Sequence, residues 1–493
     1  MSPEKPDEMD AAAAAESRNG GSLLPEGFLF GVATAGFQVE GGFNGPGEPE
    51  NNWVAWEREG RVESSGIALD FWNSYEAHLD RVAAMGCDSF RMSVEWARVC
   101  PAPGEVSQEA LEGYRSILSA CAERSIEPLV TLHHFTHPAW LGVDLWLRPD
   151  SPDLFCEWVR TAVGSLGGLC RNWVTINELN IYAVNTYLIG MFPPGRRGDV
   201  ASATRAIDNM ITAHVRAYEV IHEMEPDASV ATNNFTLSIY ELDRLASDVI
   251  AAPSLGVDRS RLGPWLASRR AEYYASLGST GSVVGDRLEK AIRRLAARTS
   301  QLEEAFPRAV AAAYAASSPR LADVVQLDYY DPFAAHHVRL PGHRTAGGRT
   351  WLPGRMLWDD LPCPDDMRSF LEAARQPGLD IWIVENGLSN RVKRGRRYPR
   401  MDRYDRPRYM REHLAAVLGA IEAGLPITGY WHWTLADNYE WGSYEPRFGI
   451  FGVDRERGVR VGGLDSMGLD AAGAYRRLIE GLRSGDRSVL DPR

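Results

Sequence analysis

The sequence has few cysteines, and they are not arranged to hold a metal or to build a disulfide framework. Six occur in 493 residues, none in a CxxC pair and none with a histidine at metal-ligand spacing: Cys87, Cys100, Cys121, Cys156, Cys170 and Cys363. Small disulfide-built folds and structural zinc sites depend on such spacings. We therefore expect reduced, mostly buried thiols in a cytoplasmic protein.

Long apolar runs are also missing. No stretch approaches the roughly 18 consecutive apolar residues that a membrane span requires. Residues 1–21 are acidic and rich in alanine, and they lack the basic and apolar regions of a secretory signal. Their composition predicts a disordered leader ahead of the folded chain, and we expect no membrane partner.

Positive charge is in deficit across the chain. The 53 Lys and Arg residues against 66 Asp and Glu leave a formal net charge of −13, which argues against nucleic acid or an anionic membrane as the main partner. The segment 391–397 is basic, but an RNA-binding segment would need interleaved aromatic residues and basic surroundings, and neither is evident. We interpret it as a solvent-exposed loop after the seventh strand.

No internal repeat or low-complexity linker divides the chain, which predicts one domain. Eight segments with strand character alternate with segments of helical periodicity: 28–35, 88–94, 127–134, 173–178, 228–233, 324–329, 381–385 and 427–433. This alternation predicts an α/β fold, a single (β/α)8 TIM barrel with elaborated βα loops, rather than a doubly wound sheet. We place the barrel domain at residues 22–485, with a mostly helical insertion at 241–316 and a C-terminal tail at 486–493.

Two of the predicted strands end in a glutamate. Four apolar residues precede Glu385, which is followed by Asn-Gly, and Trp173 to Ile176 precede Asn177 and Glu178. A lone glutamate at a strand end is usually a surface ion-pair partner, but the carboxyl ends of barrel strands are where chemistry is done. Two glutamates there suit glycoside hydrolysis, one as acid/base and the other as nucleophile or base.

Several motifs occur in the order found in family 1 glycoside hydrolases, the β-glucosidase and β-galactosidase group, and the chain resembles that family from about Leu23 to Leu482. The matching segments are 28–41, 90–98, 131–140, 173–178, 383–387, 429–441 and 447–454. The resemblance implies a retaining (β/α)8 enzyme with no metal and no organic cofactor. The small residues after the first strand would also let Gln38 and Glu40 approach the site.

The resemblance assigns catalytic roles position by position. It implies that Glu385 is the nucleophile and Glu178 the acid/base. Arg91 matches the arginine beside the nucleophile, and Tyr330 matches the tyrosine that hydrogen-bonds it. His133 and His134 could instead be core histidines or metal ligands, but no third ligand with fitting spacing is apparent.

The resemblance also implies a sugar pocket. Its members bind hydroxyls or line the glycone subsite: Gln38, His134, Asn177, Trp433, Glu440 and Trp441. Asn177 is expected on the 2-hydroxyl. Glu440 favours an unphosphorylated glycone, because the 6-phospho subgroup of the family carries a serine and a lysine in this region.

The chain departs from the family pattern at four positions near the site. Leu179 replaces a proline after the acid/base, Val384 a threonine before the nucleophile, and Phe135 a tryptophan after the pocket histidine. Asp328 stands where the family usually has asparagine. An extra carboxylate near Glu178 could alter the pKa of Glu178 or pair with a basic neighbour.

We therefore expect a retaining exo-β-glycosidase that hydrolyses unphosphorylated β-glucosides, β-galactosides or β-fucosides. Its partner would be a small-molecule β-glycoside, and the oligomeric state stays open. Two alternatives remain: a transglycosidase that moves the glycosyl group to an alcohol, and a carbohydrate-binding protein without turnover. The aglycone is expected to meet loops such as 241–270 and 335–360.

Overall fold

The computed structural model describes residues 21–277, 304–330, 362–400, 402–456 and 458–492. Residues 1–20 of the expected leader and the loop 335–360 lie outside these residues. Within the described chain, no helix is both long enough and apolar enough to cross a bilayer.

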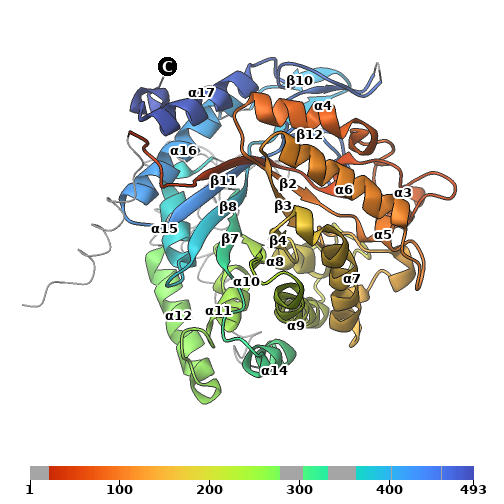
Figure 1. The fold of residues 1–493 in the computed structure, drawn as a ribbon, viewed down its shortest axis with the longest axis vertical. Helices are drawn as coiled ribbons and strands as arrows, with labels where there is room; N and C mark the ends of the chain where they lie inside the picture. The colour runs from red at the N-terminus through yellow and green to blue at the C-terminus, as the bar shows by residue number, and fades with distance from the viewer. Residues whose placement is uncertain (1–20, 278–303, 331–361, 401, 457, 493) are drawn as a thin grey trace, which may run out of the picture.

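A parallel sheet closes into a barrel at the centre of the molecule (Figure 1). Its strand order is β5-β4-β3-β2-β1-β11-β8-β7-β6. The strands are β1 (Leu29–Ala33), β2 (Ser89–Ser93), β3 (Glu127–Thr131), β4 (Asn172–Val174), β5 (Ser229–Ala231), β6 (Asn233–Phe235), β7 (Val324–Asp328), β8 (Asp380–Asn386) and β11 (Ile427–Trp433). Only Thr232 separates β5 from β6, so these two are halves of one bent strand. The predicted eight-stranded barrel is thus confirmed, with its fifth strand split.

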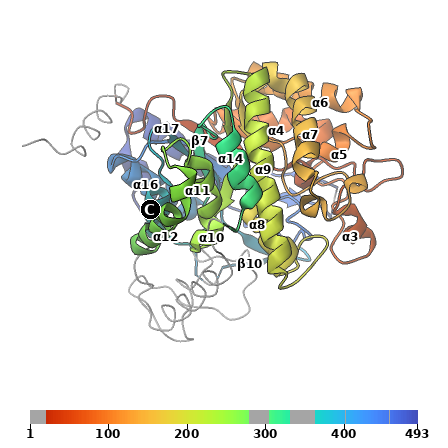
Figure 2. The same cartoon turned by 90° about the horizontal axis from the view of Figure 1, so that it is seen from below.

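Helices surround the barrel on the outside. They are α2 (Gly36–Val39), α3 (Val54–Arg58), α4 (Phe71–Ala84), α5 (Trp96–Val99), α6 (Gln108–Glu123), α7 (Ser151–Leu166), α8 (Leu179–Ala183), α9 (Val200–Met224), α10 (Tyr240–Asp243), α11 (Leu245–Ala251), α12 (Leu262–Ser276), α14 (Pro307–Ala315), α15 (Pro364–Ala374), α16 (Arg406–Glu422) and α17 (Ala471–Ser484). Figure 2 shows the long α9 lying between α7 and α14, with both of which it packs. The described part of the insertion 241–316 is mostly helical, as predicted.

The core has two layers, as the alternation of strand side chains requires. The larger apolar cluster fills the space between strands and helices, and a smaller one lies inside the barrel. Trp431 fills much of that interior and is fully buried. A side chain at Gly31 or Gly429 would collide with its indole ring, so these two glycines make the space that Trp431 occupies. Burying so large a side chain contributes roughly 2–3 kcal/mol.

The basic segment 391–397 lies largely exposed after β8, the seventh strand of the barrel, as predicted, and it forms a β-hairpin. Strands β9 (Asn390–Lys393) and β10 (Arg396–Tyr398) pair around Arg394 and Gly395, both of which have positive φ. β9 also pairs with β12 (Pro446–Arg447), and Glu445 beside β12 forms ion pairs with Arg391 and Lys393. These pairs hold the basic side chains at the surface.

Two further expectations concern the cysteines and the tail. All six cysteines are free, and five of them are buried, as predicted.

Residues 487–490 of the expected tail form a short 3-10 helix, and Arg487 binds Glu422 of α16 through both carboxylate oxygens. A small ribbon of β13 (Val453–Asp454) and β14 (Arg460–Val461) completes the described strands.

Candidate active site

The two predicted catalytic glutamates lie at the carboxyl ends of β4 and β8. The chain continues past β4 in register with its neighbours, since the Asn177 amide donates to the His133 carbonyl at 2.9 Å. Glu178 then adopts a left-handed conformation, with φ 40° and ψ 57°, which turns the backbone into α8. A residue other than glycine in that region is strained, and such residues cluster at functional sites.

Glu385 lies at the end of β8 in a tight backbone arrangement. A side chain at Gly387, two residues after Glu385, would collide with the carbonyl oxygen of Trp433. Only glycine therefore lets the end of β8 approach the end of β11 this closely. The glutamate is fixed on rigid backbone, not on a mobile loop.

The carboxylate of Glu385 is buried and held by two donors. Arg91 Nη1 donates to Oε1 at 2.6 Å, and the Tyr330 hydroxyl donates to Oε2 at 2.8 Å. Burial raises the pKa of Glu385, whereas the Arg91 charge and the Tyr330 hydrogen bond oppose that rise. The two partners favour the ionised form that a nucleophile needs.

Glu178 has different surroundings. Burial raises its pKa well above the ordinary glutamate value, and the charges of Asp328 and Glu385 raise it further. One carboxylate oxygen from each of Glu178, Asp328 and Glu385 lies within 4.8 Å of the others. Glu385 is thus contacted by hydrogen-bond donors, whereas Glu178 lies beside other acids. This difference favours an ionised Glu385 and a protonated Glu178.

The predicted sugar-binding side chains form one connected cluster beside this pair. Gln38 Nε2 donates to Glu440 Oε2 at 3.3 Å, and Trp433 Nε1 donates to Glu440 Oε1 at 3.2 Å. His134 stacks between Trp433 and Trp441, with ring centroids 5.9 and 5.8 Å away.

The electrostatics of this cluster follow from its burial. Burial raises the pKa of Glu440 to about 8. Burial also lowers the pKa of His134 well below its usual value, so this ring is neutral at physiological pH. Asn177 Nδ2 lies 3.2 Å from His134 Nε2, which connects the sugar cluster to the catalytic side.

One residue expected near the site lies elsewhere. The Glu40 carboxylate accepts from Arg98 Nε at 2.8 Å and from the Tyr114 hydroxyl at 2.9 Å. It belongs to a buried network behind α2, because residues two apart on this short helical segment face different sides. His133 is a core histidine, since its Nε2 accepts from Trp146 Nε1 at 3.2 Å.

A metal site deserves consideration because three acids are so close together. Among the described residues, only Glu178, Asp328 and Glu385 bring three potential ligand atoms to within 4.8 Å of one another. However, Arg91 already lies among them, 2.6 Å from Glu385 and 3.8 Å from Asp328. Its guanidinium supplies the positive charge that a cation would otherwise provide.

Comparison with known proteins decides the family. The family model described as "Glycosyl hydrolase family 1" matches residues 21–260 and 344–462. The chain belongs to glycosyl hydrolase family 1. It is 28% identical over 459 residues to β-glucosidase A of Thermotoga maritima, an alignment covering 89% of this chain and 95% of that one. It is also 28% identical over 454 residues to a 6-phospho-β-galactosidase of Clostridium acetobutylicum, covering 87% and 92%.

Solved structures agree on the fold of this family 1 glycoside hydrolase. A β-glucosidase from Thermotoga maritima in complex with deoxynojirimycin superposes with a TM-score of 0.70 at 23% identity, covering 94% of this chain and 99% of that one. The same enzyme in complex with azafagomine gives 0.69 at 24% identity, covering 93% and 99%. Both comparisons support the TIM-barrel architecture.

Asn233 is a site residue of this family 1 enzyme that the sequence reasoning missed. Its Nδ2 donates to Asn177 Oδ1 at 3.0 Å and to Asp328 Oδ2, and its Oδ1 accepts from the Glu178 amide at 3.4 Å. Its position in the sequence could have indicated this role, because Asn233 lies at the end of the predicted fifth strand. A polar residue at the carboxyl end of a barrel strand points toward the site.

The three apolar departures from the family pattern are all buried. Leu179 begins α8, and Val384 belongs to the cluster inside the barrel. Phe135 has φ 66° and packs against Trp441 with ring centroids 5.0 Å apart. These side chains support the site by packing and add no charge to it.

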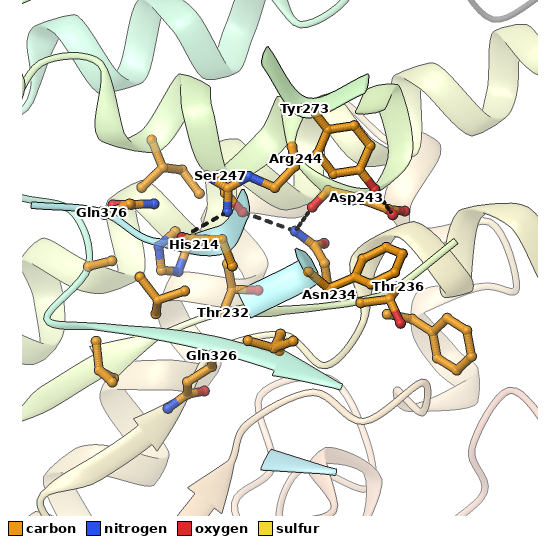
Figure 3. Close-up of a pocket in the computed structure, with 18 residues that line it drawn as sticks. His214, Thr232, Asn234, Thr236, Asp243, Arg244, Ser247, Tyr273, Gln326 and Gln376 are labelled. Atoms are coloured by element: carbon orange, nitrogen blue, oxygen red, sulfur yellow. Dashed lines mark hydrogen bonds between the residues drawn. The ribbon is translucent and has the colours of Figure 1, made fainter. Parts of the chain in front are cut away.

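A separate small cavity lies outside the barrel, between the strands β6 and β7 and the helices α9, α11 and α15 (Figure 3). Its volume of about 40 Å³ leaves room for about three water molecules. Asn234 lines it and donates to the Ser247 hydroxyl at 3.1 Å and to the Asp243 carbonyl at 3.3 Å. Neither Glu178 nor Glu385 lines this cavity, so we assign it to packing behind the split strand.

Proposed function

We propose that this family 1 enzyme is a retaining exo-β-glycosidase that hydrolyses unphosphorylated β-glucosides, β-galactosides or β-fucosides. The observation that carries the proposal is the carboxyl separation. One carboxylate oxygen of Glu178 and one of Glu385 lie within 4.8 Å of each other, which supports the close spacing, roughly 5–5.5 Å, typical of retaining enzymes. Inverting enzymes need about 6.5–9.5 Å, to leave room for a water molecule.

The two reaction steps follow from this geometry. Glu385 attacks the anomeric carbon while the bond to the aglycone oxygen breaks, and the proton on Glu178 moves to that oxygen. Water then attacks the same carbon and releases Glu385, giving one proton to Glu178. Each step inverts the anomeric centre, so the product retains its configuration.

Arg91 has a positioning role in this scheme. Its guanidinium donates to the Glu385 carboxylate and also, through Nη2, to Asn177 Oδ1. It therefore fixes the nucleophile relative to the residue expected on the 2-hydroxyl. Such preorganisation is worth most for hydrogen bonds that strengthen in the transition state.

Glu440 supports an unphosphorylated glycone, although some relatives of similar identity are 6-phospho-β-galactosidases. Its carboxyl contacts Gln38 and Trp433, and in the described chain it forms no ion pair. Phosphate groups are bound by cationic or multiple amide donors. An acidic side chain at this place favours hydroxyl groups instead.

The test is hydrolysis of 4-nitrophenyl β-glucoside, β-galactoside, β-fucoside, β-mannoside and β-glucoside 6-phosphate. We expect release from at least one of the first three, and a loss of at least about 10⁴-fold in Glu385→Gln, because that side chain cannot attack. Analysis of the product anomer by proton NMR checks retention, and added methanol separates hydrolysis from transfer.

The control is Glu76→Gln, which makes the same chemical change at an exposed position of α4 and should leave the rate unchanged. Turnover confined to the 6-phosphate would refute the glycone assignment. A first-formed product of inverted configuration would refute the mechanism.

A further inference from the structure

A third carboxyl group lies beside the two glutamates. Asp328 is the last residue of β7 and is fully buried. The pairing of β7 with β8 shifts at this point, because Leu327 pairs with Ile383 but Asp328 pairs with Glu385. Val384 is therefore the extra residue of a bulge, a feature that re-aims neighbouring side chains. The shift places Asp328 directly opposite the proposed nucleophile.

The charges around Asp328 do not balance if all three acids are ionised. Arg91 on β2 is the only cation among the described residues that pairs with any of them, and it is closer to Glu385 than to Asp328. Tyr330 donates to Glu385, and Asn233 donates to Asp328 but carries no charge. Three anions against one guanidinium in a buried site are unfavourable, so the cluster retains a proton.

Two oxygen atoms indicate where that proton lies. Glu178 Oε1 and Asp328 Oδ1 are buried, and no N–H or O–H group of the described residues donates to either. Buried polar atoms normally have a hydrogen-bond partner. A proton held between the two carboxyl groups supplies the missing donor for both residues.

We propose that Asp328 is a positioning residue that keeps the catalytic proton on Glu178, so that the enzyme retains its acid form to a higher pH than it would with an amide at this position. The proposal rests on the acid/base role given to Glu178 in the proposed function. Burial raises the pKa of both carboxyl groups well above their ordinary values, and the contact between them adds to this rise for Glu178 and opposes it for Asp328.

The arrangement also serves the second step. When Glu385 becomes an ester, its negative charge disappears and Arg91 no longer has an anion at 2.6 Å. Asp328, 3.8 Å from Arg91 Nη1, is then the anion that faces the guanidinium. Glu178, having given its proton to the leaving oxygen, accepts one from the attacking water, so the proton count is restored after each turnover.

The variant that tests the proposal is Asp328→Asn, which keeps the shape and removes the charge. We expect the basic limb of the pH profile of kcat/KM to move down by about one pH unit or more. At a pH above that limb, the variant would lose about tenfold or more relative to the wild type. The acid limb, set by Glu385, should move less, because Arg91 and Tyr330 are its main partners.

Asp380→Asn is the matched control. It makes the same change on β8 but at the opposite end of the strand, five residues from Glu385 and therefore roughly 16 Å away. Both limbs should stay in place in this variant. A basic limb that is unchanged in folded Asp328→Asn, or a loss that is equal at every pH, would overturn the proposal.

A second measurement requires no turnover, because it records protonation directly in variants that lack Glu385. Infrared difference spectra of Glu385→Gln, recorded as a function of pH, report the protonated carboxyl stretch. Glu95 and Glu440 also keep protons up to about pH 8, so the signal is the difference between Glu385→Gln and Glu385→Gln/Asp328→Asn. We expect one protonated carboxyl group of Glu385→Gln to be lost at lower pH in the double variant. Identical titrations of the two variants would contradict the inference, whereas a wild type silent on every glycoside would contradict only the proposed function.

Discussion

Glu385 can stay ionised in a buried site because two hydrogen-bond donors compensate for its lost hydration. Arg91 supplies charge and Tyr330 supplies a neutral hydrogen bond. The two contributions can be separated by experiment, because a tyrosine hydroxyl can be deleted without changing the ring or the net charge.

Tyr330→Phe should slow the enzyme and move the acid limb of its pH profile. Loss of the 2.8 Å hydrogen bond removes an interaction that lowers the pKa of Glu385. The pKa of Glu385 therefore rises, the acid limb moves to higher pH, and kcat/KM falls by roughly tenfold, as for a lost hydrogen bond to a charged group. Rates at pH 4–9 on the best aryl glycoside check this.

The neighbouring Tyr329→Phe is the control, because the Tyr329 hydroxyl donates to the Cys363 carbonyl at 2.7 Å instead of to the nucleophile. That variant should lose stability without any movement of the acid limb. Equal pH profiles for the two variants would contradict the role given to Tyr330.

At this scale, the sequence predicted most of the site. The side chains that were predicted to be catalytic or to bind sugar do lie together, because their motifs follow the ends of barrel strands. Glu40 was misplaced because sequence spacing does not show which side of a short helical segment faces the barrel. Asn233 was missed because its importance arises from contacts with Asn177, Glu178 and Asp328, which come from three other segments of the chain.

Among the elements, the strands were predicted more accurately than the connections. Apolar, β-branched runs such as 381–384 can only be buried strands in this alternation, whereas the bend at Thr232 and the bulge at Val384 depend on pairing with neighbours. The hairpin 390–398 was likewise hidden, because its basic residues are balanced by Glu445 from a distant segment.

In the contact between α9 and α14, a side chain of α9 caps the amino-terminal end of α14. Asp208 of α9 accepts from the Ala309 amide at 2.8 Å and from the Arg308 amide at 3.3 Å, in the first turn of α14. Those amides have no partner within their own helix. Asp208 thus fixes the start of α14 on the outer side of the barrel.

Asp208→Ala should lower the free energy of unfolding by about 1–2 kcal/mol, the usual cost of losing a cap. Activity per folded molecule should not change, because both helices lie outside the barrel. Urea denaturation measures the loss, and Glu223→Ala, at an exposed position of the same helix, is the control. A decrease no larger than that of the control would show that the cap does not contribute.

In the molecule as a whole, several acids are buried with raised pKa values, and this sets the pH dependence of stability. Burial raises the pKa of Glu95 and of Glu440 to about 8, and that of Asp243 to about 7. Buried histidines with lowered pKa values, such as His134, act in the opposite direction below about pH 6.5, the ordinary histidine pKa. Above that pH these acids keep protons in the folded state that they release in the unfolded state. Their contribution to stability is fully present below their unfolded pKa values and is lost as the pH rises through the folded ones.

We expect the melting temperature to fall by several degrees between about pH 6.5 and pH 9. Glu95→Gln should reduce this fall, because it removes one of the protons that the folded state retains. Differential scanning fluorimetry across this range checks both expectations, with Glu76→Gln as the exposed control. A melting temperature that rises from about pH 6.5 to pH 9 would refute the linkage.

The two ends of the barrel domain meet at the face opposite the catalytic one. The Leu23 amide donates to the Leu482 carbonyl at 3.0 Å, and Arg483 binds Asp88, the residue just before β2. The amino-terminal ends of the strands lie at this face, whereas Glu178 and Glu385 lie at the carboxyl ends. An enzyme attached to a solid support or to a second protein through this face would keep its sugar pocket directed toward the solution.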